Sequence, residues 1–208
     1  MASTSSPYGF KAVNELGGLP YAGSTRNIPI ASGYATNIYN GSLVYVQSTG
    51  YLAIATSTGA DATTNGFPTG TANTGCVGVF VGCSYTNPST KQKVFAQYWP
   101  SGTVASDAVG IVIDDDRTVF QVQAAGSMTI ADLGANVYLN AVQSTSTGST
   151  TSGNSNTAVN ATAVTTTAAF RVVGFVDMVG FSQVGDAYTD ILVKFNPGYH
   201  SYSNAVGL

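Results

Sequence analysis

The chain has 208 residues, of which only 8% are charged, and its seven basic and ten acidic residues give a formal net charge of −3. A chain of this length is typical of one domain, and its 44% hydrophobic content argues against intrinsic disorder. Because no basic run occurs, the positive surface that nucleic-acid binding requires is missing, so we expect no nucleic-acid partner.

The apolar runs of the sequence are all short. The longest have the length of a β-strand, well below the roughly 20 residues that a transmembrane helix needs. The first residues, "MASTSSPYGFKAVNELGG", lack the basic and apolar regions of a secretory signal. The sequence therefore predicts no membrane partner.

Residues 1–40 are predicted to form an extended N-terminal arm. They show little periodicity and contain three prolines, which disfavour helix. The arm also carries five aromatic residues, which need to be buried either on the arm's own domain or on a neighbouring molecule. The sequence leaves both alternatives open for Tyr8, Phe10, Tyr21, Tyr34 and Tyr39.

Residues 41–208 are predicted to form a β domain, either a sandwich or a barrel, with little helix. The stretch "SLVYVQSTGYLAIA" is typical of two short strands around a Gly-containing turn, and the Gly/Thr-rich "TSTGADATTNGFPTGTANTG" that follows predicts a flexible loop. In "TVFQVQA", residues 118–124, alternation predicts a strand with one exposed face. The one predicted helical turn lies in "TIADLGANV", with Thr129 as its cap and Gly134 as its stop.

A Ser/Thr-rich tract occupies residues 143–167, where fourteen of twenty-five residues are Ser or Thr. Such a composition predicts an insertion that forms a solvated loop or a hairpin projecting from the body. The alternative is an outward-facing surface that contacts other molecules.

The stretch from Cys76 to Trp99 is predicted to form a core hairpin around an Asn-Pro turn. Cys76 and Cys83 are seven residues apart, so on one strand they point to opposite faces and cannot bond to each other. We expect Phe80 and Cys83 to be buried structural residues, with the cysteines acting as small apolar fillers. Trp99 is expected at the rim of the hairpin, where its indole N–H needs a hydrogen-bond partner.

No catalytic constellation is evident in the sequence, so we expect neither an enzyme nor a cofactor or metal site. The only histidine, His200, is expected to be a surface or interface residue. The run Asp114–Asp116 predicts a charged turn between two strands, partly neutralised by Arg117. A glycosidase needs paired carboxylates, and Asp177 and Asp186 are the one pair to offer.

Three stretches in order carry a resemblance to a known family: "VGVFVGCSYTNPSTKQKVFAQYWPSGT", "AVGIVIDDDRTVFQVQAAGSMTIADLGANVYL" and "FRVVGFVDMVGFSQVGDAYTDILVKFNPGYHSY". Together with the opening "STSSPYGFKAVNELGG", they resemble a family of virion structural proteins of tailed bacteriophages, namely capsid decoration (cement) proteins. The resemblance covers roughly residues 1–20 and 76–202. It departs after "VVGFVD", where the family often carries more charge than "MVGFSQVG" does.

The resemblance implies a compact β domain on the outer surface of an icosahedral capsid, stabilising the shell. The implied partners are the major capsid protein and neighbouring copies of the chain. The hypothesis for the contact residues is that the arm, including Tyr8, Phe10, Arg26 and Tyr34, binds them.

A second hypothesis is a head-fibre or tail receptor-binding module that contacts host glycans. Glycan sites often use amide side chains with exposed aromatics. Asn154 and Asn156 offer the amides, but no aromatic residue lies close to them in the sequence.

Overall fold

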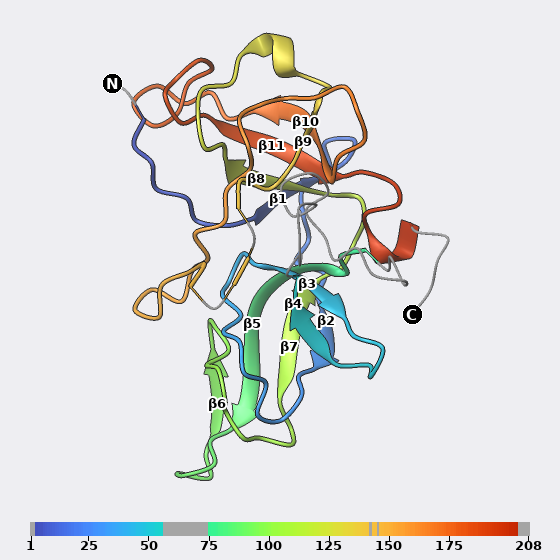
Figure 1. Cartoon of the computed structure of the whole chain (residues 1–208), viewed down its shortest axis with the longest axis vertical. Coiled ribbons are helices and arrows are strands. Elements are labelled where there is room, and N and C mark those ends of the chain that lie inside the picture. Colours follow the sequence, from blue (N-terminus) through green and yellow to red (C-terminus); the bar gives the residue numbers. More distant parts are fainter. Residues whose placement is uncertain (1–2, 56–74, 142, 145, 204–208) are drawn as a thin grey trace.

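The computed structural model describes residues 3–55, 75–141, 143–144 and 146–203, and it shows an all-β fold. Two antiparallel sheets pack together as a sandwich, with sheet A in the upper half of Figure 1 and sheet B in the lower half. Helical structure in the described residues consists of short 3₁₀ turns, Ile130–Asp132 and Ser201–Ser203. The predicted all-β class is therefore confirmed, and of the two predicted architectures the structure shows the sandwich rather than the barrel. The predicted "TSTGADATTNGFPTGTANTG" loop falls almost entirely on residues 56–74, outside the described ranges.

Sheet A has five strands in the order β1-β8-β11-β10-β9. Their bounds are β1 Lys11–Glu15, β8 Thr118–Gln123, β9 Asn136–Val137, β10 Phe170–Phe175 and β11 Asp190–Phe195. The register places Lys11 opposite Gln121, and Gln123 opposite Asp190. The segment before β1, the loop after β8 and the loop between β10 and β11 therefore meet at one end of the sheet. We call these residues, 3–10, 124–135 and 176–189, the distal end of sheet A.

Sheet B has the strand order β2-β7-β5-β3-β4, and β6 pairs with the second half of β5. The bounds are β2 Arg26–Pro29, β3 Leu43–Val46, β4 Leu52–Ile54, β5 Gly78–Thr86, β6 Lys93–Ala96 and β7 Val109–Ile113. Both predicted hairpins, β3–β4 and β5–β6, are confirmed.

The described residues form two hydrophobic cores, and β5 contributes to both. One core lies between the sheets and includes Val79, whereas the other covers the far face of sheet B and includes Val77 and Phe80. Strict alternation would put Val77 and Val79 on one face of β5, but the two side chains lie in different cores. The alternation is reset at Gly78, whose φ is +155° and where a Cβ would overlap the carbonyl oxygen of Ile113.

A second irregularity in β5 shifts the alternation again, so that residues after it face the sides that an uninterrupted strand would give them. The pairing of β5 with β7 shifts between Phe80 and Gly82, as a β-bulge does. Cys76 and Cys83 consequently lie in different cores, and both thiols are free and buried. Their predicted placement on opposite faces, as apolar fillers, is confirmed, and burial raises the pKa of each thiol to about 12.

The N-terminal arm is extended, but it packs on its own domain. It supplies β1 at one edge of sheet A and β2 at one edge of sheet B. Phe10 is only 1% exposed and stacks on Phe170 with ring centroids 4.9 Å apart. Of the two alternatives for the aromatic residues, the structure shows the first for Phe10.

The Ser/Thr-rich tract includes a hairpin, in which Gly148 bridges Ser155 antiparallel and residues 149–152 at the tip are exposed. Other parts of the tract are buried on the body. Gln143 is 1% exposed, and its amide pairs with the backbone N–H and C=O of Leu43 and with the C=O of Ala55. Further along, Asn154 bridges to Asn40 and Val159 to Ala124. The short polar side chains satisfy backbone groups across the sandwich, so a polar composition here does not mean exposure.

The expectation of an exposed face on strand β8 is also wrong. Val119 and Gln123, on its polar face, are 5% and 7% exposed. The first described residues cross this face and shield it from solvent, as the hydrogen bonds of Ser6 and Thr4 with Gln123 show.

Candidate functional site

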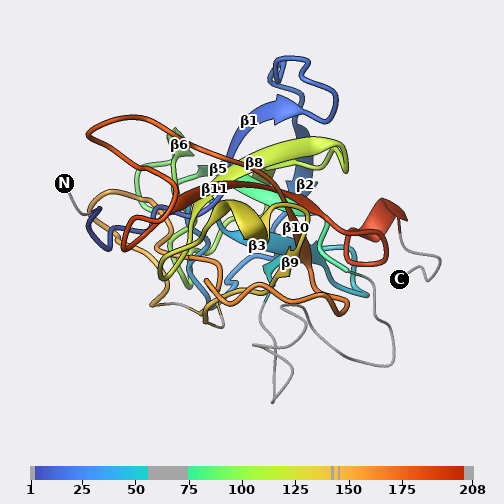
Figure 2. The same cartoon turned by 90° about the horizontal axis from the view of Figure 1, so that it is seen from above.

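A groove of about 500 Å³ opens at the distal end of sheet A. It separates the N-terminal segment from the loop between β10 and β11, which Figure 2 shows on the same side of the molecule. Ser3 connects the N-terminal segment to this loop, because its hydroxyl donates to the carbonyl of Tyr188 at 2.6 Å and accepts from the Tyr188 N–H at 2.8 Å. The lining residues are Ser3, Thr4, Ser6, Tyr8, Gln123, Gly180, Phe181, Ser182, Tyr188 and Asp190.

Gln123 holds the N-terminal wall of this groove. Its Oε1 accepts a hydrogen bond from the N–H of Ser6 at 2.8 Å, and its Nε2 donates to the carbonyl of Thr4 at 3.2 Å. The buried amide of Gln123 thus pairs with backbone groups of residues 4–6, which have no neighbouring strand to pair with.

The floor of the groove carries two buried polar atoms without a regular hydrogen bond, the hydroxyl of Tyr8 and Oδ1 of Asp190. Asp190 is 2% exposed, and its other carboxylate oxygen, Oδ2, accepts from Nε2 of Gln121 at 3.3 Å. A carboxylate oxygen has room for about two donors, so Oδ1 is left with unused acceptor capacity at the groove.

The charges around this floor are perturbed in a consistent way. Burial raises the pKa of Asp190, against the opposing effects of the Gln121 hydrogen bond and the positive charge of Lys11. Burial, followed by the negative charge of Asp190, raises the pKa of Tyr8. A side-chain interaction between Tyr8 and Asp190 adds to the rise in the pKa of Tyr8 and opposes the rise in the pKa of Asp190, which places the two groups beside each other. The ammonium group of Lys11 lies 4.5 Å from the centre of the Tyr8 ring.

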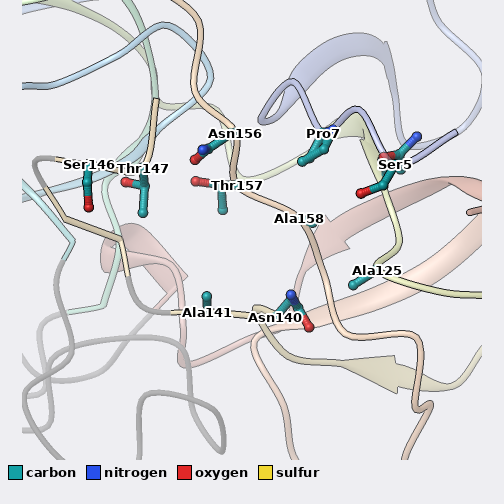
Figure 3. Close-up of a pocket in the computed structure, with 11 residues that line it drawn as sticks. Ser5, Pro7, Ala125, Asn140, Ala141, Ser146, Thr147, Asn156, Thr157 and Ala158 are labelled. Atoms are coloured by element: carbon teal, nitrogen blue, oxygen red, sulfur yellow. The ribbon is translucent and has the colours of Figure 1, made fainter. Parts of the chain in front are cut away.

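A second hollow, of about 260 Å³, lies between the N-terminal segment and the Ser/Thr-rich tract. Figure 3 shows Ser5 and Pro7 on one side of it and the amides of Asn140 and Asn156 on others. A neighbouring hollow joins Asn154 and Asn156 to Tyr8. The structure thus brings an aromatic residue to these two asparagines, although none is close to them in the sequence.

Exposed apolar side chains mark the same end of the molecule. The loop between β10 and β11 presents Met178, Val179 and Phe181, which are 58%, 86% and 60% exposed. The neighbouring loop presents Ile130 and Leu133 at 67% and 50%. The two loops are joined by hydrogen bonds, because the N–H of residue 185 donates to the carbonyl of residue 128 at 2.8 Å.

The four arm residues of the contact hypothesis are not brought together. Tyr8 lines the distal groove and Phe10 is in the core. Arg26, on β2, forms an ion pair with Asp114 at 2.8 Å. Tyr34 packs on sheet B, where its hydroxyl accepts from a backbone N–H of β4 at 3.1 Å.

The residues expected to be structural are buried in the core on the far face of sheet B. Phe80 and Trp99 are fully buried and Cys83 is 1% exposed. The indole N–H of Trp99 donates to the carbonyl of Tyr34 at 3.2 Å, which confirms the expected need for a partner. The expected rim position is wrong: β6 ends at Ala96, and the bend that follows turns Trp99 inward.

The expected surface position of His200 is also wrong. This residue is fully buried, its Nδ1 accepts from the N–H of Tyr202 at 3.3 Å, and burial lowers its pKa. The Asp114–Asp116 turn is confirmed between β7 and β8, but the described ion pair to Asp114 comes from Arg26 rather than Arg117.

Within the described ranges, no three His, Cys, Asp or Glu side chains are grouped so as to hold a metal ion. Nor do these ranges contain a helix with the length and apolar character needed to cross a membrane. Of the two carboxylates offered for sugar hydrolysis, Asp186 accepts a hydrogen bond from the N–H of Gln183 at 3.0 Å, inside its own loop.

Comparison of the chain with protein-family models, curated proteins and solved structures gave no match.

The sequence patterns did not indicate Asp190, Gln121 and Gln123 as residues of the site. The signal for Asp190 was a lone carboxylate directly before the apolar run "ILVKF" in a chain poor in charge. Alternation assigns the two glutamines to an exposed strand face, since nothing local in the sequence indicates that the N-terminal segment crosses it.

Proposed function

We propose that this chain is a virion structural protein of a tailed bacteriophage, which decorates the outer surface of the capsid and stabilises it. The observation that carries the proposal is the group of exposed apolar side chains at the distal end of sheet A, led by Met178, Val179 and Phe181. Large apolar side chains that gather on a surface poor in charge are typical of a protein contact.

The rest of the molecule suits attachment to a flat partner. The sandwich holds the loop between β10 and β11 at the end of two strands, β10 and β11, that are paired along their length. A loop that is anchored at both ends on a rigid support loses less conformational entropy on binding than a free segment does. The resemblance to decoration proteins in the sequence supplies the proposed partners, the major capsid protein and neighbouring copies of this chain.

Stabilisation of the shell follows from linkage. A protein that binds the assembled shell and not its separated subunits shifts the equilibrium toward the shell. A contact of about 800 Å² per partner is sufficient if one molecule touches several subunits, because the later contacts form at a high effective concentration.

The structure changes how the contact surface should be tested. Deletion of residues 2–30 would remove β1, β2 and the buried Phe10, so it would damage the domain as well as any contact. Substitutions at exposed positions avoid this problem.

The test is co-sedimentation of the purified chain with capsid shells assembled from the major capsid protein of the same genome. The double variant Met178→Asp/Val179→Asp should lose binding, because it places charge in the proposed contact. The control is Phe95→Asp on β6, where the side chain is 78% exposed at the opposite end of the molecule. Equal binding by both variants would contradict the contact surface.

The proposed location has its own test. A cryo-EM map of virions should show this chain on the outside of the head. Density on the tail alone would contradict the decoration role.

A further inference from the structure

The floor of the distal groove holds polar groups that the fold itself does not fully use. Oδ1 of Asp190 and the hydroxyl of Tyr8 are both buried without a regular hydrogen bond, and both residues belong to the lining of the groove. A buried polar group without a partner costs about 1–3 kcal/mol. Two such groups at one open groove are the mark of a binding site, because a ligand would supply the partners.

The other lining groups define the chemistry of that ligand. Around these two neighbouring atoms lie the hydroxyls of Ser3 and Ser182, while Phe181 provides an apolar wall that is 60% exposed. Asp190 requires hydrogen-bond donors, and a phenol and serine hydroxyls both donate and accept. A ligand with several hydroxyl groups and one apolar face meets all of these requirements.

We propose that the distal groove binds one neutral pyranose ring of a carbohydrate, with a sugar hydroxyl donating to Oδ1 of Asp190, a second pairing with the hydroxyl of Tyr8, and Phe181 covering a face of the ring. The groove volume of about 500 Å³ lies in the range of small-molecule sites. No bond is made or broken, so the site is a binding site. The proposal does not depend on the capsid role.

A metal ion fits this groove less well than a sugar. Calcium takes six to eight oxygen ligands, usually with several carboxylates, and among the described residues that line the groove Asp190 is the only carboxylate. A cationic organic ligand is also disfavoured, because the positive charge of Lys11 already acts on Asp190.

The proposal is tested by saturation-transfer NMR and calorimetry on the full chain. The probes are the methyl pyranosides of glucose, galactose, mannose and N-acetylglucosamine at millimolar concentration. At least one should bind. Tyr8→Phe should weaken that sugar about tenfold, as loss of one hydrogen bond to a buried group does, while leaving the fold intact.

Further variants locate the site and control for folding. Asp190→Asn and Phe181→Ala should each weaken binding by a similar factor, and Phe181→Ala changes only an exposed side chain. Phe95→Ala, at the opposite end of the molecule, should bind like the unaltered chain. The proposal is overturned if none of the four sugars binds, if the groove variants bind as well as Phe95→Ala, or if calcium alone raises the melting temperature and Asp190→Asn abolishes that rise.

Discussion

The two ends of the molecule differ in how completely their polar side chains are hydrogen-bonded. At the β5–β6 hairpin, Asp107 accepts hydrogen bonds from Lys93 Nζ at 2.8 Å and from the N–H and hydroxyl of Thr86 at 2.9 and 2.7 Å. The buried indole N–H of Trp99 is also paired. At the distal end of sheet A, the buried Asp190 and Tyr8 each retain an atom without a regular hydrogen bond.

From this difference we infer that the hairpin end is structural and that the distal end is available for binding. Folded domains pair nearly all of their buried polar groups, and the indole N–H of Trp99 at the hairpin end follows this rule. Three further buried polar atoms without a regular hydrogen bond, on Ser42, Thr118 and His200, do not line the groove, so the distal end is distinguished by having such atoms at an open groove. Exposed apolar residues occur at the distal end beside these atoms, which makes it the better candidate for recognition.

The largest expected effect belongs to the hairpin end. Trp99→Ala should lower the free energy of unfolding by about 3–5 kcal/mol, because it empties a fully buried site and removes the hydrogen bond to Tyr34. Chemical denaturation measures this change. Phe95→Ala, on the neighbouring β6, should stay within about 0.5 kcal/mol, since its side chain is 78% exposed. Equal losses in the two variants would refute the assignment of Trp99 to the core.

The next largest effect tests how the N-terminal segment is held. Gln123→Ala should cost about 1–3 kcal/mol, because the N–H of Ser6 and the carbonyl of Thr4 lose their partner. The segment should also become more accessible, which limited proteolysis followed by mass spectrometry detects. Gln92→Ala, at an exposed glutamine, is the control. If the two variants are cleaved equally slowly in this segment, Gln123 does not hold it.

Several features of the fold could be predicted from the sequence. The hairpins, the all-β class and the opposite placement of Cys76 and Cys83 follow from local alternation and turn residues, which a sequence displays directly. The position predicted for Trp99 was wrong because a bend after Ala96 interrupts that alternation. Alternation is a local signal, and it fails wherever the backbone departs from a regular strand.

The distal site could not be predicted because its parts are far apart in the chain. Ser3 and Tyr188 are hydrogen-bonded across 185 residues, and Gln123 is buried by residues that precede β1. The burial of other parts of the Ser/Thr-rich tract was not predicted for a related reason. Hydroxyl groups pair equally well with water and with the protein backbone, so composition alone does not distinguish a surface loop from one that binds across the sandwich.

A smaller effect on the melting temperature is expected from Asp190→Asn, and its sign tests the difference between the two ends. The pKa of Asp190 is raised in the folded state, so folding favours the protonated carboxyl, and stability falls as pH rises from about 3.9 through the folded pKa. The amide introduced by this substitution would carry no charge and could still accept from Gln121. The variant should therefore match the unaltered chain near pH 3 and melt at a higher temperature at pH 7. A variant that is less stable at pH 7 would show that the Asp190 charge supports the fold.

The smallest effect belongs to Asp107→Asn, and it should have the opposite sign. The hydrogen bond from Lys93, followed by those from Thr86, holds the pKa of Asp107 well below its usual range. Because the folded pKa is depressed, the stabilising contribution is present above the unfolded value of about 3.9 and is lost as pH falls through the folded pKa.

Asp107→Asn should thus lower the melting temperature slightly at pH 7, with a difference that shrinks below pH 3.9, about the unfolded value. The group is exposed, so the loss should also shrink in high salt, where the Lys93 ion pair is screened. Melting curves of both aspartate variants across pH measure the comparison directly. If the two curves deviate from the unaltered chain in the same direction at pH 7, the carboxylates do not differ in pairing, and the distal end loses its distinction as the end with unused hydrogen-bonding groups.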